Sequence, residues 1–258
     1  MLDSSEIKRI ALEVGFDDCG IARADAITDG EYPLRQWLAR GWNGDLDYME
    51  RNIEKRLDPR LLVPGARSVI CCVSAYPPPD SGEWRMENGE KRIAAYARTR
   101  DYHVDIKQML FALRERLGID GKCCCDTVPI SDKHWAARAG LGWIGRHTLL
   151  VTKRWGSWVN LGEIVTTEEC SEYSDYSENS ENSDFCAKCG RCVEACPNRA
   201  LASEGPSMLN VTRCTSYYTT HRNRPLPPDV ETHGYTQGCD LCQLACPFNR
   251  QQSRASAQ

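Results

Sequence analysis

Hydrophobic residues follow two spacings along the first 167 residues, and the two spacings alternate. Apolar positions three and four residues apart predict helices over 4–14, 33–38, 45–51, 101–117 and 131–139. Short apolar runs predict strands over 19–22, 67–76, 122–128, 148–152 and 157–166. The run from Arg67 to Tyr76 leads directly into three prolines, so we expect a central strand there. Helices that alternate with short strands indicate a layered α/β (α+β) domain.

The pattern changes at residue 168, where the chain becomes polar, acidic and low in complexity. Seven acidic residues and no basic residue lie between Glu168 and Asp184, whereas the whole chain of 258 residues has a formal charge of −4. The rest of the chain therefore has a formal charge of +3, which is far below the positive charge of a dedicated nucleic-acid-binding protein. We expect a solvated linker or surface loop here. The predicted division is 1–167, a linker at 168–185, a second domain at 186–250 and a flexible tail at 251–258.

Cysteine usage points to a reducing compartment. The chain has fifteen cysteines, an odd number, and it shows neither a charged-then-apolar leader nor an apolar run approaching the ~18 residues of a membrane span. We therefore expect a cytoplasmic protein without a membrane segment, with thiols kept free for metal.

Seven of the cysteines form two runs that end in proline. A C-x2-C-x2-C-x3-C-P run begins at Cys186, and a C-x2-C-x3-C-P run begins at Cys239. This is the ligand spacing of bacterial two-cluster ferredoxins, in which the fourth cysteine of a run binds the other cluster. Cys214 is the one cysteine between the runs, and it brings the count to eight. The crossover rule assigns one 4Fe–4S cluster to Cys186, Cys189, Cys192 and Cys246, and the other to Cys196, Cys214, Cys239 and Cys242. Structural zinc is the alternative, but it needs only four ligands and does not explain the x3-C-P endings.

Six segments, taken in order, resemble the epoxyqueuosine reductase family. They are 96–103 (YARTRDYH), 126–130 (DTVPI), 139–145 (AGLGWIG), 161–163 (LGE), 238–243 (GCDLCQ) and 246–249 (CPFN). The resemblance implies a cobalamin-binding catalytic domain over 1–167, followed by a ferredoxin-like domain with two 4Fe–4S clusters. It also implies the activity: removal of the epoxide oxygen from a modified wobble nucleoside in tRNA, the last step in making queuosine.

The resemblance also assigns roles to individual residues. The family's proton donor falls on Asp126, and the eight cysteines match its cluster ligands. The family's cobalamin contacts fall on Arg56, Asp126, Leu150 and Leu161, and we add Tyr96, Ser216 and Asp240 as further expected contacts. The corrin and apolar neighbours such as Val128, Leu150 and Leu161 should then wall the Asp126 site, and the loss of water is expected to raise the pKa of Asp126. Family members usually continue into a helical-repeat domain that helps hold tRNA, so a chain ending at Gln258 is expected to be a short form.

Each of these features also has a purely structural interpretation. Asp126 could be a strand-end carboxylate that caps the following turn. The glycines of 139–145 follow a helix instead of a strand, so they do not form a dinucleotide loop; we expect them to let the backbone approach the corrin. His103 and His147 have no partner at ligand spacing, so they are more readily structural than metal-binding. The three cysteines before Asp126 are interpreted as buried strand residues.

Two classes of function fit these residues. One is a reductase acting on a tRNA anticodon stem-loop, or on the modified nucleoside or another small molecule, supplied by an external single-electron donor such as flavodoxin or ferredoxin. The other is a ferredoxin-like electron carrier without a substrate of its own. A bound corrinoid distinguishes them, because a carrier needs none. We expect a monomer in either case.

Overall fold

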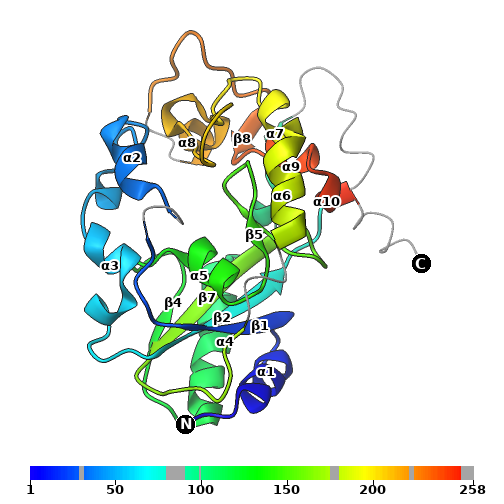
Figure 1. The fold of residues 1–258 in the computed structure, drawn as a ribbon. Helices are drawn as coiled ribbons and strands as arrows, with labels where there is room; N and C mark the ends of the chain where they lie inside the picture. The colour runs from blue at the N-terminus through cyan, green and yellow to red at the C-terminus, as the bar shows by residue number, and fades with distance from the viewer. Residues whose placement is uncertain (29–31, 80–90, 99, 175–179, 221–223, 251–258) are drawn as a thin grey trace.

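A computed structural model describes the chain except for residues 29–31, 80–90, 99, 175–179, 221–223 and 251–258 (Figure 1). The expected tail at 251–258 therefore lies outside the described residues. The helices are α1 (Ser4–Glu13), α2 (Leu34–Ala39), α3 (Ile53–Leu57), α4 (Tyr102–Leu117), α5 (Asp132–Arg138), α6 (Ser180–Cys189), α7 (Arg191–Glu194), α8 (Thr215–Thr220), α9 (Leu241–Leu244) and α10 (Pro247–Arg250). The strands are β1 (Asp18–Arg23), β2 (Ser68–Ala75), β3 (Arg92–Ile93), β4 (Lys122–Cys124), β5 (Trp143–Ile144), β6 (Leu150–Val151), β7 (Val159–Thr166) and β8 (Tyr235–Gln237).

Strand β2 lies inside a four-stranded antiparallel sheet of order β1-β2-β7-β4, which confirms the expected central strand. Its residues alternate between two buried clusters: Val69 and Cys71 face one, and Ile70 and Cys72 face the other. The first cluster includes residues of α5, and the second includes residues of α1 and α4. Because helices cover both faces, β2 is apolar throughout even though its neighbours are antiparallel.

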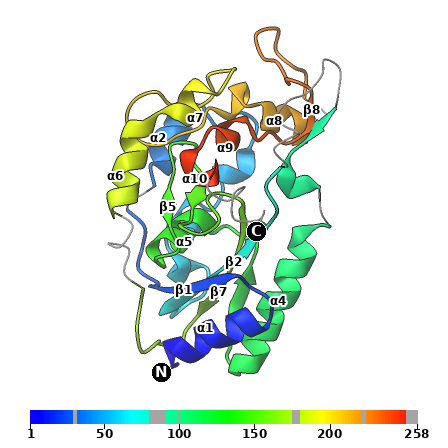
Figure 2. The ribbon, with the colours of Figure 1, turned by 90° about the vertical axis from the view of Figure 1, so that its right-hand side faces the viewer.

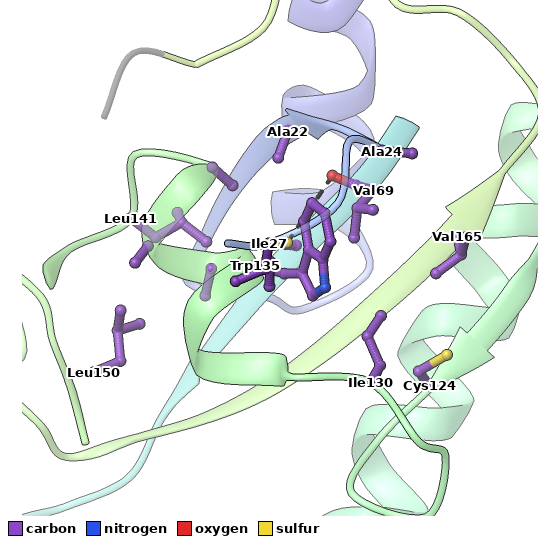
Figure 3. Packing of buried hydrophobic residues seen from close by; sticks show 14 of the residues in the cluster. Ala22, Ala24, Ile27, Val69, Cys124, Ile130, Trp135, Leu141, Leu150 and Val165 are labelled. Atoms are coloured by element: carbon purple, nitrogen blue, oxygen red, sulfur yellow. Dashed lines mark hydrogen bonds between the residues drawn. The ribbon is translucent and has the colours of Figure 1, made fainter. Parts of the chain in front are cut away.

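The indole of Trp135 fills the centre of the first cluster (Figure 3). It projects from α5 onto the sheet, and Val69 of β2, Val165 of β7 and Ile130 lie around it. Trp135 is fully buried, and aromatic side chains of this size contribute a large buried apolar area to a protein core. The contact fixes α5, and with it the segment that leads into the helix, over the sheet.

Three predicted elements differ from the structure. The expected helix at 45–51 is a 3-10 turn, Asp47–Met49, followed by α3. The expected strand at 122–128 ends at Cys124, because Asp126 takes a positive φ of 53° that no strand accommodates. The expected linker at 168–185 is structured where it is described: Leu2 forms a β-bridge with Cys170, and helix α6 begins at Ser180.

The C-terminal third packs on the opposite side of the molecule from α1 and α4 (Figures 1 and 2). The two parts interlock, since β3 pairs in parallel with β8 and the indole nitrogen of Trp37 donates to the Leu209 carbonyl at 2.6 Å. The side chain of Asn249 also accepts from the Ser157 backbone at 2.7 Å. Among the described residues, no helix is long and apolar enough to cross a membrane.

Candidate functional site

The eight cysteines predicted as cluster ligands line two cavities. The walls of the smaller cavity contain Cys186, Cys189, Cys192 and Cys246. The walls of the larger cavity contain Cys196, Cys214, Cys239 and Cys242. This division into two groups of four is the one that the crossover rule assigns from the sequence.

Short helices present these thiols. Gly190 takes a φ of 67° between α6 and α7, and this sharp turn separates Cys189 on the first helix from Cys192 on the second. In the second run, Cys246 follows α9, and Pro247 then begins α10, where proline is tolerated because the first helical N–H has no intrahelical acceptor. The x3-C-P ending thus carries the last cysteine of the run away from the preceding helix.

The thiols surround open space instead of converging on a point. Within the described part of the chain, no group of three or more His, Cys, Asp or Glu residues is placed to hold a metal ion. Burial raises the pKa of Cys239 to about 12 and that of Cys246 to about 11. Such thiols become thiolates when they bind a metal, since a coordinating cation deprotonates them. The donor set is therefore chemically suited to clusters, in which each iron takes one thiolate.

The larger cavity has a volume of about 330 Å³ and lies between the sheet domain and the second cysteine group. Four of the residues expected to contact cobalamin line it: Tyr96, Leu150, Leu161 and Ser216. The wall is mostly apolar, with a few polar side chains, as is typical of cofactor sites. A single chamber therefore connects one group of four thiols with the side chains expected to bind a corrin.

Asp126 adjoins this chamber through Tyr102. The Tyr102 hydroxyl donates a hydrogen bond to Asp126 Oδ2, and His103 Nε2 lies 3.5 Å from the same oxygen. Tyr102 lines the cavity, and its ring stacks on His103 with centroids 4.1 Å apart. Burial and the adjacent carboxylate raise the pKa of the Tyr102 hydroxyl, which therefore remains a donor. His103 is thus a partner of Asp126.

Three of the expected contacts do not line the larger cavity, and their roles stay predictions. The Asp126 side chain is half exposed, and Val128 packs against the sheet core. Arg56 is not among the residues lining the larger cavity; its Nη2 donates to the Tyr48 carbonyl at 3.1 Å. Asp240 is also absent from that wall; it is buried and accepts from the Ala95 backbone at 2.8 Å, which holds the segment carrying Tyr96.

The glycines of 139–145 serve the protein's own packing. A Cβ on Gly142 would lie 2.1 Å from the Val151 carbonyl oxygen, and one on Gly145 would lie 2.8 Å from the His147 ring. Both distances are far below van der Waals contact. Gly142 and Gly145 thus make room for strand β6 and an imidazole, and the approach of the backbone to the corrin at this segment stays a prediction.

A buried carboxyl pair was not identified from the sequence. Glu163 is fully buried on β7, and the Asp132 carboxyl is its neighbour. Neither Glu163 oxygen has a hydrogen-bond partner among the described residues. Two adjacent carboxyls can hydrogen-bond to each other only if one of them is protonated. Burial and the neighbouring acid raise the pKa of Glu163, and burial raises that of Asp132 to about 6. The one sign of this pair in the sequence was Glu163 itself, a single acidic residue inside an apolar predicted strand.

Lys133 was also missed, because a lone lysine in the first turn of a helix resembles a surface residue. Its ammonium donates to the Thr148 carbonyl at 2.7 Å, and burial lowers its pKa. Lys133 lines both the larger cavity and an adjoining one of about 220 Å³. Tyr32, Trp37 and Tyr48 contribute to that second wall, so an aromatic chamber continues from the larger cavity.

Comparison with known proteins identifies both parts of the chain. The family model described as epoxyqueuosine reductase QueG, DUF1730, matches residues 56–128, and the 4Fe-4S double cluster binding domain matches residues 185–249. An epoxyqueuosine reductase from Cellulophaga algicola is 35% identical over 254 residues, which cover 96% of this chain and 79% of that protein. The chain belongs to the epoxyqueuosine reductase family. It is an iron–sulfur oxidoreductase of that family.

Solved members of the family share the fold. An epoxyqueuosine reductase crystallised with an epoxyqueuosine-modified tRNA-Tyr stem loop gives a TM-score of 0.84 at 30% identity, over 96% of this chain and 65% of that one. The Bacillus subtilis enzyme, solved with its catalytic aspartate loop swung out of the active site, gives 0.78 at 28% identity over 96% of this chain and 65% of that one. A reductive dehalogenase described as B12-dependent shares the fold at a TM-score of 0.60 and 17% identity, over 97% of this chain and 33% of its own.

Proposed function

We propose that this chain is a cobalamin-dependent reductase that converts epoxyqueuosine to queuosine in tRNA. The observation that carries the proposal is the larger cavity, whose wall contains four cysteine thiols and Tyr102, the hydrogen-bond donor to Asp126. The relative crystallised with a modified stem loop supports the substrate. The B12-dependent dehalogenase supports the cofactor only at the level of a shared fold.

The residues present fit both kinds of cofactor. The two groups of four cysteines would hold two 4Fe–4S clusters, and Tyr96, Leu150, Leu161 and Ser216 would contact the corrin. When bound, cobalamin supplies a reducible cobalt that accepts electrons singly and delivers them to the substrate. The apolar cavity wall limits the access of water to that chemistry.

Asp126 is assigned the proton transfer. Removing an epoxide oxygen as water consumes two electrons and two protons, and an acid near the leaving oxygen typically accelerates such a step about 10²–10⁴-fold. Tyr102 and His103 hold the Asp126 carboxyl at the cavity edge. Its loop position and positive φ support this assignment, since the Bacillus subtilis relative was solved with its aspartate-bearing catalytic loop swung out of the active site.

The partners follow from this chemistry. Electrons enter from an external single-electron donor such as flavodoxin or ferredoxin. The tRNA anticodon stem-loop is the expected substrate, with the free modified nucleoside as the competing possibility. All fifteen cysteines are unpaired, which agrees with a cytoplasmic location, and we expect a monomer.

The test is anaerobic reconstitution with iron, sulfide and cobalamin, followed by turnover of an epoxyqueuosine-containing stem-loop and of the free nucleoside. We expect about eight irons and eight sulfides per chain from the eight thiolates, bound corrinoid, and queuosine as product. Zinc without acid-labile sulfide, or no corrinoid binding, would refute the cofactor assignment. Reduction of neither substrate would refute the epoxide assignment.

A substitution tests the acid. Asp126→Asn should retain both clusters and the corrinoid but lose at least about 10²-fold in turnover, the low end for general acid catalysis. Asp120→Asn is the matched control, because Asp120 is an exposed carboxylate that precedes strand β4, whereas Asp126 follows it. Full activity of Asp126→Asn would assign the proton to another group.

A further inference from the structure

His147 lies between the two cysteine groups. It follows β5, is 3% exposed, and contributes to the wall of the smaller cavity as well as the larger one. Its ring is held in place, because Gly145 leaves room for the imidazole where any Cβ would lie 2.8 Å from Cε1. A fixed, buried imidazole thus belongs to the walls of both thiol-lined cavities.

The hydrogen bonding of His147 determines which nitrogen carries the proton. The Leu149 backbone N–H donates to His147 Nδ1 at 3.2 Å, so Nδ1 is an acceptor and bears no hydrogen. In a neutral imidazole the hydrogen is then on Nε2. A nitrogen that bears hydrogen has no free lone pair for a metal, so Nε2 is a hydrogen-bond donor and not an iron or cobalt ligand.

Nε2 is buried and has no hydrogen-bond partner within the described part of the chain. Leaving a buried donor unpaired costs about 1–3 kcal/mol, so an acceptor is expected beside it. Apart from His147, the smaller cavity is lined by the four thiols and by Gly190, Pro247 and Phe248, whose side chains contain no acceptor. Sulfur is therefore the side-chain acceptor that this wall offers.

We infer that His147 donates a hydrogen bond from Nε2 to a sulfur of the 4Fe–4S cluster held by Cys186, Cys189, Cys192 and Cys246. This inference rests on the proposed cluster ligation and is independent of the substrate. A hydrogen bond to sulfur stabilises the more negative, reduced cluster and raises its reduction potential. The other cysteine group lines the larger cavity, so His147 would favour electron uptake at the cluster farther from the substrate.

The experiment compares the potentials of both clusters in reconstituted holoenzyme by redox titration monitored with electron paramagnetic resonance. His147→Phe keeps an aromatic ring and removes the donor. We expect one cluster to become about tenfold harder to reduce, which is about 59 mV for a one-electron couple. The other cluster should be unchanged. His103→Phe is the matched control, since it removes an imidazole near neither cysteine group, and it should leave both potentials unchanged.

A second measurement does not depend on the variant folding. Electron–nuclear double resonance of the reduced wild-type cluster in H2O and D2O should show an exchangeable proton coupled to it, and His147→Phe should lack that proton. Wild-type protein that holds no iron would refute the cluster ligation, and this inference with it. Fully loaded clusters with unchanged potentials in His147→Phe, or a wild-type cluster with no exchangeable proton, would refute the inference alone.

Discussion

The buried pair of Glu163 and Asp132 should make this protein less stable as pH rises, and a single substitution should remove that pH dependence. Glu163 is fully buried beside Asp132, and both groups have a raised pKa in the folded chain. In the unfolded chain Glu163 loses its proton near its ordinary value of 4.5. Above that pH the folded state holds a proton that the unfolded state does not. The stability contributed by the protonated pair is therefore present at low pH and is lost as pH rises toward the folded value.

The magnitude follows from one retained proton. Each pH unit between the unfolded and the folded pKa of Glu163 lowers the free energy of unfolding by about 1.36 kcal/mol, so two pH units inside this window lower it by about 3 kcal/mol. Glu163→Gln has no proton to lose, and its amide can donate to Asp132 permanently. At about 2–4 °C per kcal/mol for a chain of this size class, the Tm difference between variant and wild type should grow by roughly 6–12 °C over that range in favour of the variant.

The assay is thermal unfolding of anaerobically reconstituted protein at one scan rate, because unfolding of a cluster protein is not expected to be reversible. Glu169→Gln is the matched control: its carboxylate is partly exposed and pairs with Arg67 on the surface, so its Tm should follow that of the wild type. Infrared spectra at pH 7 should also show a protonated carboxyl band that Glu163→Gln lacks. A Tm difference that stays constant with pH would show that the pair does not retain a proton.

Two further predictions concern the cofactor site. Cys214→Ser should lower the iron content from about eight to about four per chain, because only one group of thiols uses Cys214. Cys170→Ser is the control: Cys170 is buried and belongs to neither group, so this variant should retain all the iron. An unchanged iron content in Cys214→Ser would remove Cys214 from the ligand set. Tyr102→Phe should retain the clusters and the cavity wall but lose about 10- to 100-fold in stem-loop turnover, since a hydrogen bond to a charged group contributes about 1.5–3 kcal/mol. Wild-type turnover in Tyr102→Phe would show that Asp126 needs no orientation from this hydroxyl.

The sequence by itself determined those features that depend only on the spacing of residues close together along the chain. Cysteine spacing fixes how thiols can be arranged around a cluster, so the division into two groups of four was predictable, and it remains a prediction that the cavities support. Apolar spacing likewise predicted α1, α4 and the buried strand β2. The acidic stretch before Cys186 was misjudged, because a low-complexity segment can still form a helix once it packs against a folded neighbour, as α6 does.

The tertiary structure decided the contacts between residues far apart in sequence. Tyr102 reaches Asp126 across 24 positions because α4 packs on the sheet that β4 completes. Glu163 meets Asp132 only because α5 is held over β7 by the Trp135 core. Sheet register and helix packing bring these pairs together, and neither can be recognised from a periodic pattern in the sequence around the paired residues. The sequence thus identified the chemistry available to this protein, whereas packing determined which groups share a proton, which donors are left for a cofactor, and where the acid lies.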